Sequence, residues 1–302
     1  MLNKIIETPL FAAFFYASIL IGCNDNKTGG DTVVAQCSGR TTPIASVQGD
    51  GTITPMLGQQ VTVQGIVTLI QDKHGMYIEE PGSDSNEDTS NAVFIQSADL
   101  PADVVKGSLL RVKGDVSEIG KGRYSLTAIS NVEVTHCASG EDLPMTQVTL
   151  PLNGPGREAL EGMRIRIDET LIVADVYQYG RGYFTLSGNG IHYIATEVMA
   201  PGPETVSYRA RNRAFALPVM FPEGYKLPAP LVTGSAINPI TGVMAHDGWG
   251  LRVSLQSTLP DQPVAYPLPA TADPESQRIV AMNLQNYFNG DGTGHGFPTA
   301  RG

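Results

Sequence analysis

The chain has 302 residues, enough for two domains of ordinary size, and its 33 glycines and 21 prolines make it rich in turns and loops. Only 17% of the residues are charged, and 20 Lys and Arg against 30 Asp and Glu give a formal net charge of -10. This balance argues against a protein that coats nucleic acid or anionic lipid through bulk positive charge, so a polyanion must be met locally or through a metal. A hydrophobic share of 41% also excludes wholesale disorder.

The N-terminal segment predicts export. An apolar run from Leu10 to Ile21 has the length of a signal-peptide core and is short for a bilayer span. It leads into Gly22 and Cys23, and the pattern is typical of a bacterial lipoprotein signal in which the Cys23 thiol carries the lipid. An ordinary secretory signal with an incidental cysteine is the alternative. We therefore expect an outer-membrane or cell-surface lipoprotein, anchored in the membrane at Cys23 or released from the cell.

Two further cysteines remain, Cys37 and Cys137. In an exported protein such a pair suggests one disulfide, and a pair of free thiols is the alternative. The bridge would close a loop of about a hundred residues and would stabilise the fold by roughly 4 to 5 kcal/mol in the chain-entropy model. The sequence has no Cys-x-x-Cys pair and no Cys/His cluster with zinc spacing.

Between these cysteines, short runs of β-branched and aromatic residues alternate with Gly, Pro, Asp and Asn. Runs at this spacing predict antiparallel strands that form a small barrel or a sandwich. Gly65 and Gly114 lie inside such runs, where a closed barrel needs a bulge or a sharp bend. The expected strands are 61–67, 76–79, 92–95, 109–116, 124–127 and 132–134.

A looser copy of the same pattern follows along the chain. Three segments that each begin with glycine recur in the same order, and together they predict a duplicated barrel. Convergence of two unrelated β domains on similar strand patterns is the alternative. The segments begin at Gly58, Gly75 and Gly107 in the first copy and at Gly162, Gly182 and Gly234 in the second.

Several stretches resemble one known family. Segments 43–51, 57–67, 75–78 and 137–144 are similar to the OB-fold-like domain of bacterial extracellular nucleases. Segments 278–292 and 296–302 resemble the first strand and loop of that family's endonuclease/exonuclease/phosphatase domain. The family's catalytic domain is a DNase I-like αβ-sandwich that hydrolyses phosphodiesters with a divalent metal, Mg²⁺ or Ca²⁺. The resemblance implies that Asn283 helps to position metal or phosphate.

The rest of such a site lies downstream in the family as a metal-binding Glu, an Asp-x-Asn and a terminal Asp-His pair, and none follows Asn283 here. Activation of water and stabilisation of a pentacovalent phosphate need a metal held by carboxylates and a general base. We therefore expect the N-terminal portion of an exported nuclease that acts on DNA or RNA, inactive alone. The alternatives are a non-enzymatic surface lipoprotein that binds oligonucleotide or another ligand, and a decayed gene product. No protein partner can be inferred.

The expected fold is mainly β, with two tandem OB-like antiparallel β-barrel domains and only the first strand of a DNase I-like α/β sandwich at the C-terminus. Linkers are placed where proline and glycine are frequent. The expected segments are a lipoprotein signal peptide (1–22), a flexible tether (23–40), an OB-fold-like barrel (41–142), a linker (143–157), a second OB-like domain (158–259), a proline-rich linker (260–276) and the start of a truncated endonuclease/exonuclease/phosphatase domain (277–302).

A basic cluster in the first barrel is a candidate nucleic-acid site. OB barrels bind single strands by stacking bases on aromatic side chains along a basic groove. Arg111 and Lys113 lie two residues apart, hence on one face of a strand. A solvated strand face beside core aromatics is the alternative. The candidate residues are Lys106, Arg111, Lys113, Lys121 and Arg123, with the aromatic Tyr77, Phe94 and Tyr124 nearby.

A second basic cluster consists of Arg209, Arg211 and Arg213. In an extended segment this spacing would aim all three side chains the same way, toward phosphates, whereas an exposed loop with unpaired arginines is the alternative. The Asp84 loop begins like a calcium loop but lacks the glycine and the glutamate that an EF-hand requires. His246 and Asp247 point apart if extended and are expected to form a turn.

Overall fold

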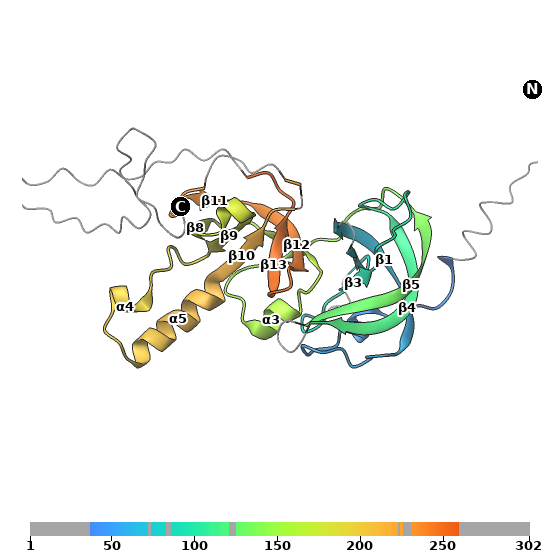
Figure 1. Cartoon of the computed structure of the whole chain (residues 1–302), viewed down its shortest axis with the longest axis horizontal. Helices are drawn as coiled ribbons and strands as arrows, with labels where there is room; N and C mark the ends of the chain where they lie inside the picture. The colour runs from blue at the N-terminus through green and yellow to red at the C-terminus, as the bar shows by residue number, and fades with distance from the viewer. Residues whose placement is uncertain are drawn as a thin grey trace, which may run out of the picture. The chain divides into compact units, whose positions relative to one another are not determined.

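The computed structural model describes residues 37–71, 74–82, 86–120, 125–222, 224–225 and 231–259 (Figure 1). All of them belong to one unit that extends to Gln262. As the sequence predicts, this part of the chain is mainly β, and its strands form two multi-strand sheets. The expected signal peptide with Cys23, the proline-rich linker and the 277–302 segment with Asn283 lie outside the described residues, as does all of the tether that precedes Cys37.

The first sheet is a closed ring of five strands in the order β1-β2-β3-β5-β4. β1 is long enough to pair with β4 through its first half and with β2 through its second half. All pairings are antiparallel except that of β3 with β5. The strands are β1 (Gln60–Gln71), β2 (Gly75–Glu79), β3 (Ala92–Gln96), β4 (Leu109–Ile119) and β5 (Leu126–Ala138).

The ring is filled by the apolar side chains that alternate along its strands. Val61 and Val63 of β1 and Val112 of β4 are buried in one core with Ile44 and Val47 of the short helix α2 (Ile44–Gln48). Residues 126–127 of the expected strand 124–127 and all of the expected strand 132–134 belong to the single long strand β5. The register of β5 against β4 shifts between Lys113 and Asp115, where Asn131 and Val132 of β5 lie opposite Gly114 alone, so the bulge expected at Gly114 is in the partner strand.

The second sheet has eight strands in the order β11-β8-β9-β10-β13-β12-β7-β6. The strands are β6 (Thr146–Gln147), β7 (Arg164–Ile167), β8 (Leu171–Asp175), β9 (Tyr183–Ser187), β10 (Ala216–Met220), β11 (Ala236–Ile237), β12 (Ile240–His246) and β13 (Leu251–Leu255). Short helices α3 (Gly154–Glu158), η2 (Tyr179–Arg181) and α4 (Ala195–Val198) and the longer α5 (Pro203–Phe215) connect them. Residues of the expected linker 143–157 therefore contribute β6 and α3 to this part of the fold.

The second sheet repeats the pairings of the first when β7 and β8 are taken as one interrupted strand and β11 and β12 as another. β12 and β9 then pair with the two halves of β7/β8, as β4 and β2 pair with the two halves of β1. The antiparallel pairs of β9 with β10 and of β12 with β13 correspond to β2 with β3 and β4 with β5. The parallel pair, β10 with β13, falls at the same place as β3 with β5.

Individual hydrogen bonds repeat as well. Val67 exchanges two backbone bonds of 2.9 Å with Gly107 and the serine after it, and Val173 exchanges two of 2.8 Å with Gly234 and the serine after it. The six landmark glycines all have positive φ, a conformation that glycine adopts without strain. The echo in the sequence therefore corresponds to the same backbone geometry formed twice.

Gly114 and Gly242 occupy corresponding positions in β4 and β12. Gly114 lies against β5, and Gly242 lies against β13. A Cβ atom would lie 2.6 Å from the Ser130 carbonyl oxygen at Gly114 and 2.4 Å from the Ser254 carbonyl oxygen at Gly242. Gly65 has no register shift, and its Cβ would lie 3.0 Å from the Glu79 carbonyl oxygen. Glycine at these places allows neighbouring strands to approach closely.

We predict that Gly114→Ala and Gly242→Ala each lower the free energy of unfolding by about 1 to 3 kcal/mol, because the added methyl group overlaps a backbone oxygen. Gly154→Ala is the control, since its Cβ meets open space. Urea denaturation measures all three. Because alanine is otherwise the better residue in regular structure, equal stability of Gly114→Ala and Gly154→Ala would contradict the proposed overlap.

Candidate binding cleft

A third apolar cluster joins the two sheets. Leu69, Tyr77 and Phe94 of the ring pack in it against Met220 and Val243 of the second sheet. Tyr77 is fully buried, and its Oη accepts a hydrogen bond of 2.9 Å from the His246 backbone N–H. Burial raises the pKa of Tyr77. The expectation that Tyr77 offers a stacking surface to nucleic acid is therefore wrong, because this ring lies in the junction.

Polar groups at the junction are also paired. Glu79 is buried, and its Oε2 accepts a hydrogen bond of 2.8 Å from the Arg164 backbone N–H. Gln256 donates from Nε2 to the Thr68 carbonyl oxygen at 2.8 Å, while its Oε1 accepts from Arg164 Nε and Lys106 Nζ at 2.9 Å each. Lys106, expected to contact nucleic acid, therefore contacts the second sheet, and burial lowers the pKa of its ammonium group.

A second buried carboxyl lies on the other side of this junction. Glu161 Oε1 accepts hydrogen bonds from the Thr127 backbone N–H at 3.1 Å and from Gln48 Nε2 at 3.3 Å. Burial, with the nearby charge of Glu158 acting in the same direction, raises the pKa of Glu161 to about 8 against the hydrogen bonds from Thr127 and Gln48. Burial also raises the pKa of Glu79 to about 7, against the hydrogen bond and charge of Arg164.

Four loops, together with the segment after β10 that carries Phe221 and Tyr225, line one cleft of about 780 Å³. Two belong to the ring: the β1–β2 loop with His74 and the β4–β5 loop with Gly120. The other two are the corresponding loops of the second sheet, the β8–β9 loop with Arg181 and the β12–β13 loop with Asp247 and Gly248. The two equivalent ends of the repeated fold therefore line a common site.

The cleft has an apolar floor and a mixed polar rim. Leu69, Phe94 and Met220 from the junction contribute apolar surface. Tyr225 lies on the rim, 36% exposed, and its ring is stacked on Phe221 with the centroids 4.8 Å apart. Such a floor with a few convergent polar groups is the usual composition of a ligand site.

Charge on the rim is mostly held by local contacts. Asp247 forms an ion pair with Arg252, and only 4% of the Asp247 side chain is exposed. The Arg252 guanidinium also lies 5.0 Å from the centre of the Tyr183 ring, a cation–π contact. Arg181 in the β8–β9 loop is exposed and forms no ion pair within the described residues. It is the rim cation best placed to meet an anion.

Two aromatic side chains stand out on the loops of the second sheet. Tyr177 is 90% exposed and Trp249 is 80% exposed, the highest values among the large hydrophobic side chains in the described part of the chain. Tyr177 precedes η2 in the β8–β9 loop, and Trp249 follows Gly248 in the β12–β13 loop. Neither ring lines the cleft itself, but each lies on a loop that does, and exposed flat rings offer surfaces for stacking. The turn expected at His246 and Asp247 begins one residue later, because His246 is the last residue of β12, and the exposure of the neighbouring Trp249 was not foreseen.

The described members of the first basic cluster do not share one groove. Lys113 is exposed on the outer face of β4, and its strand neighbour Arg111 donates to the carbonyl oxygens of Arg40 at 2.9 Å and of Gly39 at 3.3 Å. Phe94 is 4% exposed and lies in the junction. The remaining candidates, Lys121, Arg123 and Tyr124, lie outside the described residues.

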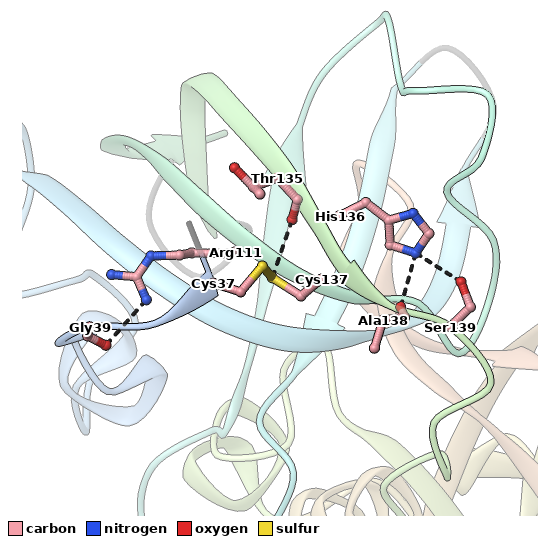
Figure 2. Close-up of a disulfide and its surroundings, with 8 residues drawn as sticks. All are labelled: Cys37, Gly39, Arg111, Thr135, His136, Cys137, Ala138 and Ser139. Atoms are coloured by element: carbon pink, nitrogen blue, oxygen red, sulfur yellow. Dashed lines mark hydrogen bonds between the residues drawn. A yellow bond between two sulfur atoms is a disulfide. The ribbon is translucent and has the colours of Figure 1, made fainter. Parts of the chain in front are cut away.

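A disulfide between Cys37 and Cys137 holds the start of the described chain against β5, with a Cα–Cα distance of 5.7 Å (Figure 2). Arg111 reaches toward the same segment and donates to Gly39 (Figure 2). The bridge and the guanidinium together fix residues 37–40 on the ring. Arg111 therefore has a structural role that the sequence did not indicate.

The second basic cluster is helical, which corrects the expected extended segment. α5 begins with Gly202 as its N-cap and Pro203 in its first turn, and no glycine or proline interrupts residues 204–215. Arginine and alanine favour the helix. In a helix, residues four apart share a face and residues two apart do not. Arg209 and Arg213 therefore share a face, and Arg211 points in another direction. The three side chains are all exposed, but they do not point the same way.

One constellation was not foreseen from the sequence. His136 Nδ1 lies 2.6 Å from Asp103 Oδ2, and its Nε2 lies 2.9 Å from both Ser139 Oγ and the Ala138 carbonyl oxygen (Figure 2 shows the last two contacts). The hydrogen bond from His136 lowers the pKa of Asp103. Donation from Nδ1 to Asp103 and from Nε2 to the Ala138 carbonyl oxygen together requires the protonated imidazolium, which is not a base for Ser139. The arrangement ties Asp103 to the end of β5.

The site that the family resemblance assigns to a divalent metal does not lie among the described residues. Within these ranges no group of three or more His, Cys, Asp or Glu is placed to hold a metal ion, and Asn283 lies outside them. We therefore derive no catalytic step through a metal. None of the described helices is both long and apolar enough to cross a membrane. Comparisons with protein-family models, curated proteins and solved structures find no match to the chain.

We predict that the junction loses stability as the pH rises. The folded-state pKa values of Glu79 and Glu161, about 7 and about 8, lie above the ordinary value of 4.5, so the folded protein binds more protons between these limits. The free energy of unfolding should therefore fall as the pH rises from about 4.5 to about 8, by a few kcal/mol in total. Glu79→Gln/Glu161→Gln should flatten this fall, whereas the exposed-site control Glu141→Gln should keep it.

Denaturation at a series of pH values measures this dependence. An equal fall in the double variant and in the unchanged chain would show that other groups are responsible. A free energy of unfolding that rises between pH 5 and pH 8 in the unchanged chain, and equally in the double variant, would contradict the assignment altogether.

Proposed function

We propose that residues 41–259 position a single-stranded nucleic acid for an exported, metal-dependent extracellular nuclease. In this proposal the protein is a lipoprotein of the outer membrane or cell surface, anchored through Cys23. The two sheets are tandem OB-like β-barrels. Hydrolysis of the phosphodiester is assigned to a catalytic domain whose start resembles residues 277–302, with Asn283 at its metal site.

The order of strand pairing supports an OB-like fold for each sheet. An OB fold is a five-stranded Greek-key barrel that binds oligonucleotides or oligosaccharides at the β1–β2 and β4–β5 loops. The ring has five strands and closes through β1 and β4. The second sheet repeats its pairings, including the parallel pair. The proposal rests on one observation. The β1–β2 and β4–β5 loops of the ring and the corresponding β8–β9 and β12–β13 loops of the second sheet line one cleft.

The chemistry of the cleft suits a single strand. Bases stack on aromatic rings without sequence preference, and exposed rings are offered by Trp249, Tyr177 and Tyr225. Arg181 can form a charge-assisted hydrogen bond to a phosphate oxygen. A chain with a formal net charge of -10 repels a polyanion at long range, so contact at such a local site must supply the affinity. The function of this part of the molecule in the proposal is to hold and orient substrate.

The proposal predicts that Trp249→Ala and Tyr177→Ala each weaken binding of a fluorescein-labelled oligothymidine about fivefold to hundredfold, because each removes one stacking surface. Arg181→Gln should lower the salt dependence of binding by about 0.7 in the slope of log K against log salt. Fluorescence anisotropy across a salt series measures both effects.

Matched controls use residues of the same type away from the cleft. Tyr193→Ala removes another exposed tyrosine, and Arg209→Gln removes another exposed arginine. Equal losses in the cleft and control variants would contradict the cleft assignment. Failure to bind DNA or RNA, together with binding of an uncharged oligosaccharide, would favour a non-enzymatic ligand-binding lipoprotein instead.

A further inference from the structure

The second sheet carries a helical hairpin that the ring lacks. α4 and α5 lie in the connection 188–215 between β9 and β10, whereas the corresponding connection between β2 and β3 is the much shorter segment 80–91. Figure 1 shows α5 running outward from β10 to a tip formed by α4 and the first turn of α5. We call residues 193–213 the α4–α5 hairpin. It is not needed to complete the repeated pairings, which suggests a separate role.

α5 has two distinct faces. Thr205, buried, and Tyr208 and Phe215, half-buried, follow helical spacing and mark the face turned toward the rest of the fold. An adjacent flank of the helix carries Val206, then Arg209 about one turn later and Arg213 about another turn later. All three are exposed, and neither arginine forms an ion pair with a described residue. This flank is therefore apolar at the tip and cationic toward the sheet.

The tip gathers apolar side chains that are open to solvent. Tyr193 is 52% exposed, Ile194 63%, Val198 48% and Val206 66%. They lie within one short stretch of chain, and α4 packs against α5. Isolated exposed apolar residues are ordinary on protein surfaces, but a local group beside basic residues marks an interaction site.

We propose that the α4–α5 hairpin docks on an anionic lipid bilayer. Apolar side chains at the tip enter the acyl boundary, while Arg209 and Arg213, about one and two turns further along α5, meet the headgroup phosphates. Glu197 and Glu204 also lie on the hairpin and limit its net charge, so the contact is auxiliary to another attachment. This role goes beyond the cleft function and does not depend on it.

Other occupants fit the surface less well. A stable protein interface uses about 20 to 30 residues from each partner, far more than this small tip offers. Nucleic acid would use the arginines, but phosphates and sugars give no partner to the isoleucine and valines. A bilayer accommodates both kinds of side chain at once, because its apolar interior takes up the isoleucine and valines while its anionic surface lies beside the arginines.

The test places a fluorescent reporter at the tip. In the full chain with Cys23→Ser, so that no acyl chain is attached, Trp249→Phe removes the native tryptophan and Val206→Trp adds one at the tip. Ile53→Trp in the same background is the control, because Ile53 is 54% exposed on the ring. Vesicles contain phosphatidylcholine with or without phosphatidylglycerol, and their acyl chains are brominated to quench a tryptophan that inserts.

We expect quenching and a blue shift for Val206→Trp in the phosphatidylglycerol vesicles and neither change for Ile53→Trp. Arg209→Gln/Arg213→Gln should weaken vesicle binding by about fivefold for each arginine, and Lys113→Gln/Arg40→Gln should not. Equal or absent quenching at the two reporters would overturn the proposal. Loss of DNA binding by the arginine double variant, with vesicle binding unchanged, would also overturn it and assign the arginines to nucleic acid.

Discussion

The arrangement of this molecule depends on the apolar junction between its two sheets. Tyr77 and Phe94 from the ring and Met220 and Val243 from the second sheet exclude water there. The hydrogen bond from the His246 backbone N–H to Tyr77 Oη fixes the end of β12 against β2. Burial of so many apolar groups favours one relative position of the sheets, because separation would expose them to water. The cleft exists because this position brings four loops together.

The repeated backbone explains why those four loops are equivalent. The same glycines with positive φ, and the same valine-to-glycine and valine-to-serine backbone bonds, form in both sheets. Each of the two sheets therefore has the same pair of loops at one end, but the side chains on these loops differ. The second sheet presents Tyr177, Arg181 and Trp249. Its hairpin of α4 and α5 is a further addition to the common plan, with its own apolar and basic surface.

Local patterns in the sequence predicted the strands and landmark glycines well, and the cysteine count led to the pair that forms the disulfide. What they could not predict depends on contacts distant in sequence. β2 is buried on both faces, since Met76 and Ile78 face the ring core while Tyr77 and Glu79 face the second sheet. Tyr77 was expected at a binding surface because OB barrels stack bases on aromatic side chains, and no local pattern shows that a second sheet covers it. The arginines of α5 were misplaced because alternating Arg and Ala or Asn also fits a strand.

The central claim is that the four equivalent loops form one site for a single strand. The most direct measurement is photo-cross-linking of the chain to an oligonucleotide that carries 5-iodouridine, followed by mass-spectrometric assignment of the attached residues. The account predicts cross-links at Trp249, Tyr177 and Tyr225, the exposed rings of the loops and rim. Cross-links confined to the outer face of β4 or to the α4–α5 hairpin would contradict it.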